Sequence, residues 1–313
     1  MKKCTRLGAI SAFTTLALAA TMATAGTVRP DAGGQMVPTG KGFGVRAEAS
    51  DAGLALDEAQ AAAAAAGQII YHNGPVMTNA IGVNVYLIWY GNWSGNTGTT
   101  IVPDFVNNLG GSPYFGINTT YYDAANKFIP NKVNLSGQAN DNYSQGTSLT
   151  DAKIKTIVSS AISSGELPKD KNGVYFVLTS KDVNETSGFC SQYCGWHTHG
   201  KISTVDIKYS FVGDASRCIS SCAAQSTSPN GNPGVDGMIS VIAHELEEAA
   251  TDPDLNAWYF ATGNENADQC AWTFGTEYTV GNGSKANMKL GSRDFLIQQN
   301  WIQATRGKCA LHL

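Results

Sequence analysis

The chain contains short runs in which nearly every residue is apolar or aromatic, separated by longer polar stretches. Such runs are typical of strands that are buried on both faces. We predict core strands over residues 83–90 and 174–179. A third strand is predicted over residues 205–212, where alternating apolar side chains share one face: Val205, Ile207, Tyr209 and Phe211.

Other segments carry apolar residues at helical spacing. A short helix is predicted over residues 102–109, ended by Gly110-Gly111. A clearer helix, capped by Thr150 or Ser148, has one apolar stripe made of Ile154, Ile157, Val158, Ala161 and Ile162. A third helix runs from about residue 236 to residue 251, before Pro253. Strands that alternate with helices predict an α/β or α+β fold, a single domain around a central sheet.

The N-terminal part lacks this patterning. Residues 1–25 are predicted to be a secretory signal peptide, because basic residues (Lys2, Lys3, Arg6) precede an apolar stretch and an Ala23-Thr24-Ala25 cleavage motif. Residues 26–67, called the lead below, are rich in Gly, Ala and Asp, so we interpret them as a low-complexity lead or pro-segment. The globular domain is expected over residues 68–313. No later stretch is long and apolar enough to predict a membrane span.

The cysteines support export. Without the signal peptide six remain, and an even number in an exported chain favours three disulfides: Cys190, Cys194, Cys218, Cys222, Cys270 and Cys309. Their spacing suggests the pairs Cys190–Cys194, Cys218–Cys222 and Cys270–Cys309, although other pairings remain open. A zinc cluster is the competing interpretation of the two C-x3-C pairs, and oxidation after export disfavours it.

Charge narrows the classes of partner. The formal net charge is -4, and only 15% of residues are charged, against about a quarter in an average domain. Since the chain has no basic run, we expect no nucleic-acid partner.

The third predicted helix carries the most informative polar residues. His244 and Glu248 are four positions apart, so both side chains lie on one face and can approach one cation. Glu245 lies on the neighbouring flank, where it could take a proton from water. This is the H-E-x-x-H pattern of zincin-like active-site helices, with Glu248 in place of the second histidine. The competing interpretation is a solvated acidic face.

A third ligand should come from beyond this helix. Asp254 follows His244 by ten residues, an offset that resembles metzincin-type metallopeptidases, although Thr251 stands where those enzymes have glycine. The remaining candidates are His197, His199, Asp252, Glu265 and Asp268. His197 and His199 are two residues apart, so they would share a face if they lie on a strand.

Several longer motifs resemble one known family. They are residues 71–76 (YHNGPV), 84–93 (NVYLIWYGNW), 188–190 (GFC) with 194–195 (CG), and 230–231 (NG) with 234–239 (GVDGMI). On these motifs the stretch 69–309 resembles the EXORDIUM, or phosphate-induced protein 1, family. The resemblance implies a secreted extracellular protein without an established reaction. Microbial members of that family often carry a His-Glu helix followed by Thr-Asp-Pro, as in Thr251-Asp252-Pro253 here.

These observations favour a secreted zinc-dependent hydrolase, a peptidase before other classes, acting on a peptide or cell-wall substrate. His244, Glu248 and Asp254 would hold the zinc, and Glu245 would be the general base. A carboxylate-rich set leaves calcium or manganese as alternatives. The alternative function is a non-catalytic cell-wall, glycan-binding or signalling module that uses aromatic residues such as Trp89, Trp93 and Trp196. A structural calcium site is a third interpretation.

Overall fold

The computed structural model describes residues 28–30, 35–41, 44, 67–304 and 306–313. The signal peptide predicted over residues 1–25 therefore lies outside the described residues. Elements in chain order are β1 Val28–Pro30, β2 Met36–Pro38, β3 Ile70–Tyr71, β4 Val83–Tyr90, α2 Gly98–Leu109, η1 Phe115–Thr120, β5 Val133–Asp141, β6 Ser148–Leu149, α3 Asp151–Ser163, β7 Gly173–Thr179, β8 Asn184–Glu185, β9 Gly195–Ile202, β10 Val205–Gly213, η2 Ala215–Arg217, α4 Ile219–Cys222, α5 Pro233–Thr251, β11 Trp258–Tyr259, η3 Asp268–Cys270, β12 Tyr278–Thr279, β13 Lys285–Ala286, β14 Met288–Leu290, β15 Arg293–Phe295, β16 Asn300–Ile302 and β17 Lys308–Ala310.

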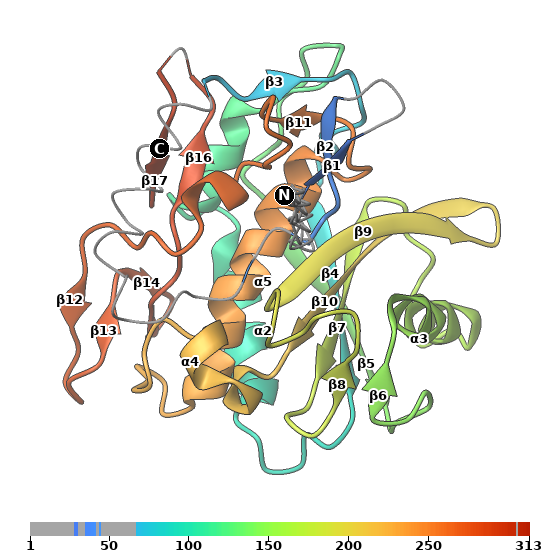
Figure 1. The fold of residues 1–313 in the computed structure, drawn as a ribbon, viewed down its shortest axis with the longest axis vertical. Helices are drawn as coiled ribbons and strands as arrows, with labels where there is room; N and C mark the ends of the chain where they lie inside the picture. Colours follow the sequence, from blue (N-terminus) through green and yellow to red (C-terminus); the bar gives the residue numbers. More distant parts are fainter. Residues whose placement is uncertain (1–27, 31–34, 42–43, 45–66, 305) are drawn as a thin grey trace, which may run out of the picture.

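A five-stranded sheet in the order β5-β4-β7-β10-β9 forms the centre of the molecule (Figure 1). Its first four strands run parallel, and β9 pairs antiparallel with β10 at one edge. The three strands predicted from apolar runs are confirmed as β4, β7 and β10. The mixed α/β class is confirmed with them.

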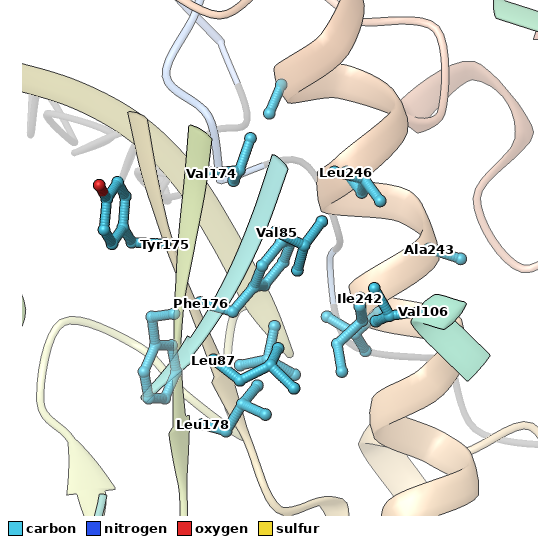
Figure 2. Packing of buried hydrophobic residues seen from close by; sticks show 14 of the residues in the cluster. Val85, Leu87, Val106, Val174, Tyr175, Phe176, Leu178, Ile242, Ala243 and Leu246 are labelled. Atoms are coloured by element: carbon cyan, nitrogen blue, oxygen red, sulfur yellow. The ribbon is translucent and has the colours of Figure 1, made fainter. Parts of the chain in front are cut away.

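Helices cover both faces of this sheet. Figure 1 shows α5 and α2 on one side and α3 on the other. In Figure 2, Leu87 of β4 and Leu178 of β7 point toward Ile242 of α5. All three side chains are buried, so this layer is the hydrophobic core and fixes α5 against the sheet.

The long helix α5 begins earlier than its apolar pattern suggests. Pro233 occupies the first turn, and the side chain of Asn232 accepts a hydrogen bond from the backbone N–H of Val235. Proline and an Asn cap are both favourable at helix starts, which explains the extension before residue 236. Helix α2 likewise starts at Gly98, before the predicted residue 102. Its first turn is polar, so the apolar pattern could not reveal it.

Sequence patterning missed two strands of the sheet. Strand β5 has few apolar residues, Val133, Leu135 and Ala139, among polar ones, and β9 carries His197 and His199 in a polar run. Both are edge strands, which need less apolar surface than central ones.

The disulfides correct part of the predicted pairing. Cys270 pairs with Cys309 as expected, but the other bonds are Cys190–Cys218 and Cys194–Cys222. The local pairs suggested by the C-x3-C spacing are therefore wrong. The loop that enters β9 lies against α4. The Cα atoms of Cys190 and Cys218 are 5.7 Å apart, and those of Cys194 and Cys222 are 5.4 Å apart. These bonds join two distant chain segments.

Among the described residues, no helix has both the length and the apolar character needed to cross a membrane. Within the lead, β1 and β2 pair antiparallel.

Candidate metal centre

Helix α5 buries the side chains that carry the proposed chemistry. His244, Glu245 and Glu248 are each 0% exposed. The alternative of a solvated acidic face is therefore wrong. Burial of ionisable groups is costly unless they are paired or bind a metal, so this face of α5 requires a specific explanation.

His244 and Glu248 face each other along the helix. Nε2 of His244 lies 2.9 Å from Oε1 of Glu248 and 3.4 Å from Oδ1 of Asp268. On the other side of the ring, the side-chain amide of Gln298 lies 2.7 Å from Nδ1 and donates to the carbonyl of Ala267. The amide thus supports the ring from outside, and Nε2 is directed at the carboxylates.

His197 brings a second imidazole from strand β9. Its Nδ1 lies 3.4 Å from Oε2 of Glu245 and 3.4 Å from Oε2 of Glu248. Its Nε2 lies 3.6 Å from Oε1 of Glu265. Two donors that each lie about 2.1 Å from a tetrahedral ion are separated by about 3.4 Å, so the two spacings around Nδ1 suit ligands of one cation.

The chain after α5 supplies the remaining carboxylates. The backbone N–H of Asp268, in η3, donates to Oε1 of Glu248 at 3.1 Å. Oδ2 of Asp268 accepts from the backbone N–H of Glu265 at 3.0 Å. Two triads of possible ligands result, and they share Glu248: His197 with Glu248 and Glu265, and His244 with Glu245 and Glu248. The five residues of these triads, together with Asp268, are called the donor cluster below: His197, His244, Glu245, Glu248, Glu265 and Asp268.

Electrostatics in the donor cluster are unbalanced. Two imidazoles face four carboxylates, and the ion pairs of the described lysines and arginines all involve other carboxylates. Both carboxylate oxygens of Glu245 and both of Glu265 are buried without a hydrogen-bond partner. A divalent cation would supply the missing positive charge, so the donor cluster could hold a metal ion.

The shifted pKa values follow from this arrangement. Burial raises the pKa of Glu245 to about 7, and burial next to other carboxylates raises that of Glu265 well above its usual range. Burial alone would lower the pKa of His197, but Glu245 and Glu248 raise it to about 10. Burial would raise the pKa of Glu248, yet the two imidazoles lower it to about 2. Shifts of this size are typical of functional sites.

Asp252 uses one carboxylate oxygen in the turn after α5, and Asp254 forms its ion pairs outside the donor cluster. Oδ1 of Asp252 accepts from the backbone N–H groups of Asn256 and Ala257, both at 2.6 Å, and so shapes the turn after α5. Oδ1 of Asp254 lies 3.0 Å from Nζ of Lys208 and 3.6 Å from Nδ1 of His199. Asp254 thus lies in a separate group, with His199 and Asp206, whose donor atoms could also hold a metal ion, and its expected role as third ligand beside His244 stays a prediction.

Strand β9 places the two histidines on one face, as their spacing suggested. His197 enters the donor cluster, whereas His199 lies further along the strand and pairs with Asp206, Nδ1 to Oδ1, at 3.0 Å. Gln298 had no recognisable signal in the sequence. Glu247, on a neighbouring flank of α5, accepts a hydrogen bond from Asn300 and is also buried.

Comparisons with known proteins place the chain in a family. A family model described as the phosphate-induced protein 1 conserved region matches residues 69–293. Protein EXORDIUM-like 3 of Arabidopsis thaliana is 36% identical over 271 residues, which cover 74% of this chain and 79% of that relative. Protein EXORDIUM-like 5 of the same plant is 33% identical over 272 residues, 74% of each chain. Protein EXORDIUM of Arabidopsis thaliana is 31% identical over 242 residues, 66% of this chain and 73% of the relative.

No solved structure matches the chain at a significant level. The family model covers more than half of the sequence, and each of the first two relatives covers 74% of it. The motifs that suggested the resemblance all begin within this matched stretch. The chain belongs to the phosphate-induced protein 1, or EXORDIUM, family.

Proposed function

We propose that this chain is a secreted metal-dependent hydrolase that acts on peptides. One observation carries the proposal: imidazoles from β9 and α5 converge with buried carboxylates on Glu248, and no lysine or arginine of the described residues balances them. Such a set is typical of a cation site, and a Glu that directly follows a metal-binding His on a helix is typical of metal-dependent hydrolysis.

The donors divide by role. Glu248, which both triads share, would hold the cation together with His197 of one triad and His244 of the other, a two-histidine, one-carboxylate set like that of many catalytic zinc sites. Glu265 and Asp268 would complete the coordination or orient the ligands. Their carboxylates add hard oxygen ligands, which manganese and calcium prefer, so either ion remains an alternative to zinc.

Glu245 would move the proton. A bound divalent cation supplies Lewis acidity, which polarises a peptide carbonyl and activates water near neutral pH. The carboxylate of Glu245 is buried and has no hydrogen-bond partner, so it is available to accept a proton from that water. The same oxygen would then donate the proton to the leaving amine, because an amide nitrogen must be protonated to depart.

Extracellular location is part of this proposal. Three disulfides favour an oxidising compartment, and the N-terminal signal motif and the EXORDIUM relatives agree with export.

The direct test measures metal content and peptide hydrolysis of the purified chain. We expect about one divalent cation per chain and cleavage of an unstructured, labelled protein such as casein. Glu245→Gln should retain the metal and lose hydrolysis by about 100-fold or more. The matched control is Glu247→Gln, which alters a neighbouring buried glutamate that faces Asn300 and should keep both properties. A chain without metal, whose stability ignores chelators, would contradict the proposal.

Complete burial of the donors favours a second function, in which the cation only stabilises a non-catalytic binding module. In that case metal would be present, and neither Glu245→Gln nor the wild type would hydrolyse peptides. The aromatic residues first considered for glycan contact do not support this module, because Trp89, Trp93 and Trp196 are themselves buried.

A further inference from the structure

Part of the lead lies against the edge of the central sheet, beside the donor cluster. The backbone N–H of His197 donates to the carbonyl of Gly40 at 2.9 Å, and Gly44 forms an antiparallel bridge with Tyr193. Both contacts fit one antiparallel register, because moving four residues forward in the lead, from 40 to 44, moves four residues back in the partner, from 197 to 193. The lead therefore meets β9 on the side that β10 leaves free, as an added antiparallel strand would.

Contact at His197 requires glycine. Gly40 has φ +72°, and a Cβ there would lie 1.9 Å from the carbonyl oxygen of His197. The residue that pairs with His197 at the edge of β9 must therefore be a glycine.

Lys41, the next residue of the lead, contacts polar and aromatic groups beside β9. Nζ of Lys41 lies 2.8 Å from Oδ2 of Asp151 and 2.7 Å from Oγ of Ser187. The same ammonium lies 5.1 Å from the ring centre of Tyr193 and 5.7 Å from that of Trp196. A carboxylate, a hydroxyl and two aromatic faces recognise a cationic side chain. Behind them, buried Glu185 accepts from Ser187 and Tyr193 and adds negative charge.

We propose that the edge of β9 is the binding site for an extended peptide with a small residue followed by a basic one, and that Gly40 and Lys41 occupy it in the intact chain. The peptide chemistry rests on the proposed hydrolase, whereas occupation by the lead does not. The lead is then a tethered inhibitor, and its displacement exposes the edge strand that carries His197.

The test uses the full chain and loosens the lead at two points. Gly40→Val introduces the Cβ that meets His197, and Lys41→Glu places a carboxylate opposite Asp151. The matched control is Gly67→Val, which alters a glycine with similar φ (+75°) that has nothing within 4 Å of the added atom. All variants carry Glu245→Gln, so binding is measured without turnover. The probes are a labelled peptide with the sequence of residues 35–44 and its Lys→Glu counterpart.

We expect the Gly40→Val/Lys41→Glu chain to bind the lysine peptide roughly ten-fold or more tightly than the control, because the site is no longer occupied. Hydrogen exchange at the amide of His197 should be faster in the same variant. The Lys→Glu peptide should bind poorly to every chain. Unchanged exchange at His197, or an open edge that does not bind the lysine peptide, would overturn the proposal.

A parallel series that retains Glu245 separates this inference from the proposed function. If the loosened chain gains peptide binding but shows no metal-dependent cleavage, the peptide-binding site is supported and the hydrolase proposal is contradicted. If the wild type and the Gly40→Val/Lys41→Glu chain show equal metal-dependent cleavage, the hydrolase proposal is supported and the inhibitory role of the lead is contradicted.

Discussion

Nδ1 of His197 lies 3.4 Å from Oε2 of Glu248, which joins the antiparallel edge strand β9 to helix α5. Neither element alone carries enough donors for a cation site. The strand contributes one imidazole, and the helix contributes another together with two carboxylates. The sheet and the helix must therefore pack correctly before the donor cluster exists.

The two histidines of β9 should differ in their effect on metal binding. His197→Ala should weaken metal affinity by more than the roughly 10–100-fold typical of residues outside the coordination sphere. His199→Ala should leave it unchanged, because His199 pairs with Asp206 instead. Titration of the chelator-treated protein with zinc measures both. Equal affinities for the two variants would exclude His197 as a ligand.

The acidic residues beyond α5 offer a second contrast. Glu265→Gln should weaken metal binding, since the carboxylate lies 3.6 Å from Nε2 of His197. Asp254→Asn should retain the metal, because its Oδ1 pairs with Lys208 and His199 and not with the donor cluster. Metal content per chain is the measurement. Loss of metal from Asp254→Asn alone would return the third-ligand role to Asp254.

Removal of the metal should destabilise the fold. Without a cation, the carboxylates of Glu245 and Glu265 are buried with no hydrogen-bond partner. A ligand present at about 1,000 times its dissociation constant contributes about 4 kcal/mol, so excess chelator should lower the Tm by several degrees. The His197→Ala chain should show a smaller decrease on chelation. Identical Tm values with and without chelator would contradict a bound cation.

Gln298 should act on the metal through His244. Its side-chain amide lies 2.7 Å from Nδ1, so Gln298→Ala should reduce metal affinity by about 10–100-fold. Gln298→Glu should restore much of that affinity, because its carboxylate accepts from the Nδ1–H of a ligated imidazole. The zinc titration of both variants measures this. Equal loss in the two variants would mean that Gln298 only fills space.

The disulfide pattern can be checked without structure determination. Trypsin leaves Cys190 and Cys194 on one peptide and Cys218 and Cys222 on another, so the observed pairing links the two peptides when no reductant is present. Replacing Cys194 and Cys222 by serine should lower the free energy of unfolding by about 2–5 kcal/mol. Two separate tryptic peptides would indicate the local pairs.

Much of the core was predictable because apolar runs report directly on burial. Strand β4 has the predicted bounds, and the His244–Glu248 spacing identified the helix face that carries the donor cluster. The partners that complete the cluster were less predictable, because turn geometry decides where they lie. Asp254 follows α5 closely, yet the hydrogen bonds of Asp252 direct the chain so that Glu265 and Asp268 enter in its place.

Gly195 starts β9 at a point where the strand packs tightly against α5. A Cβ at this position would lie 2.4 Å from Cγ1 of Val241 and 3.3 Å from Oε1 of Glu245. A single hydrogen atom in place of a methyl group thus sets how near the edge strand comes to the glutamates. Glycine at this place should therefore be checked together with the histidines when homologues are screened for metal binding. A sequence that keeps the His-Glu helix but has a bulkier residue there would hold its strand too far away to share a cation.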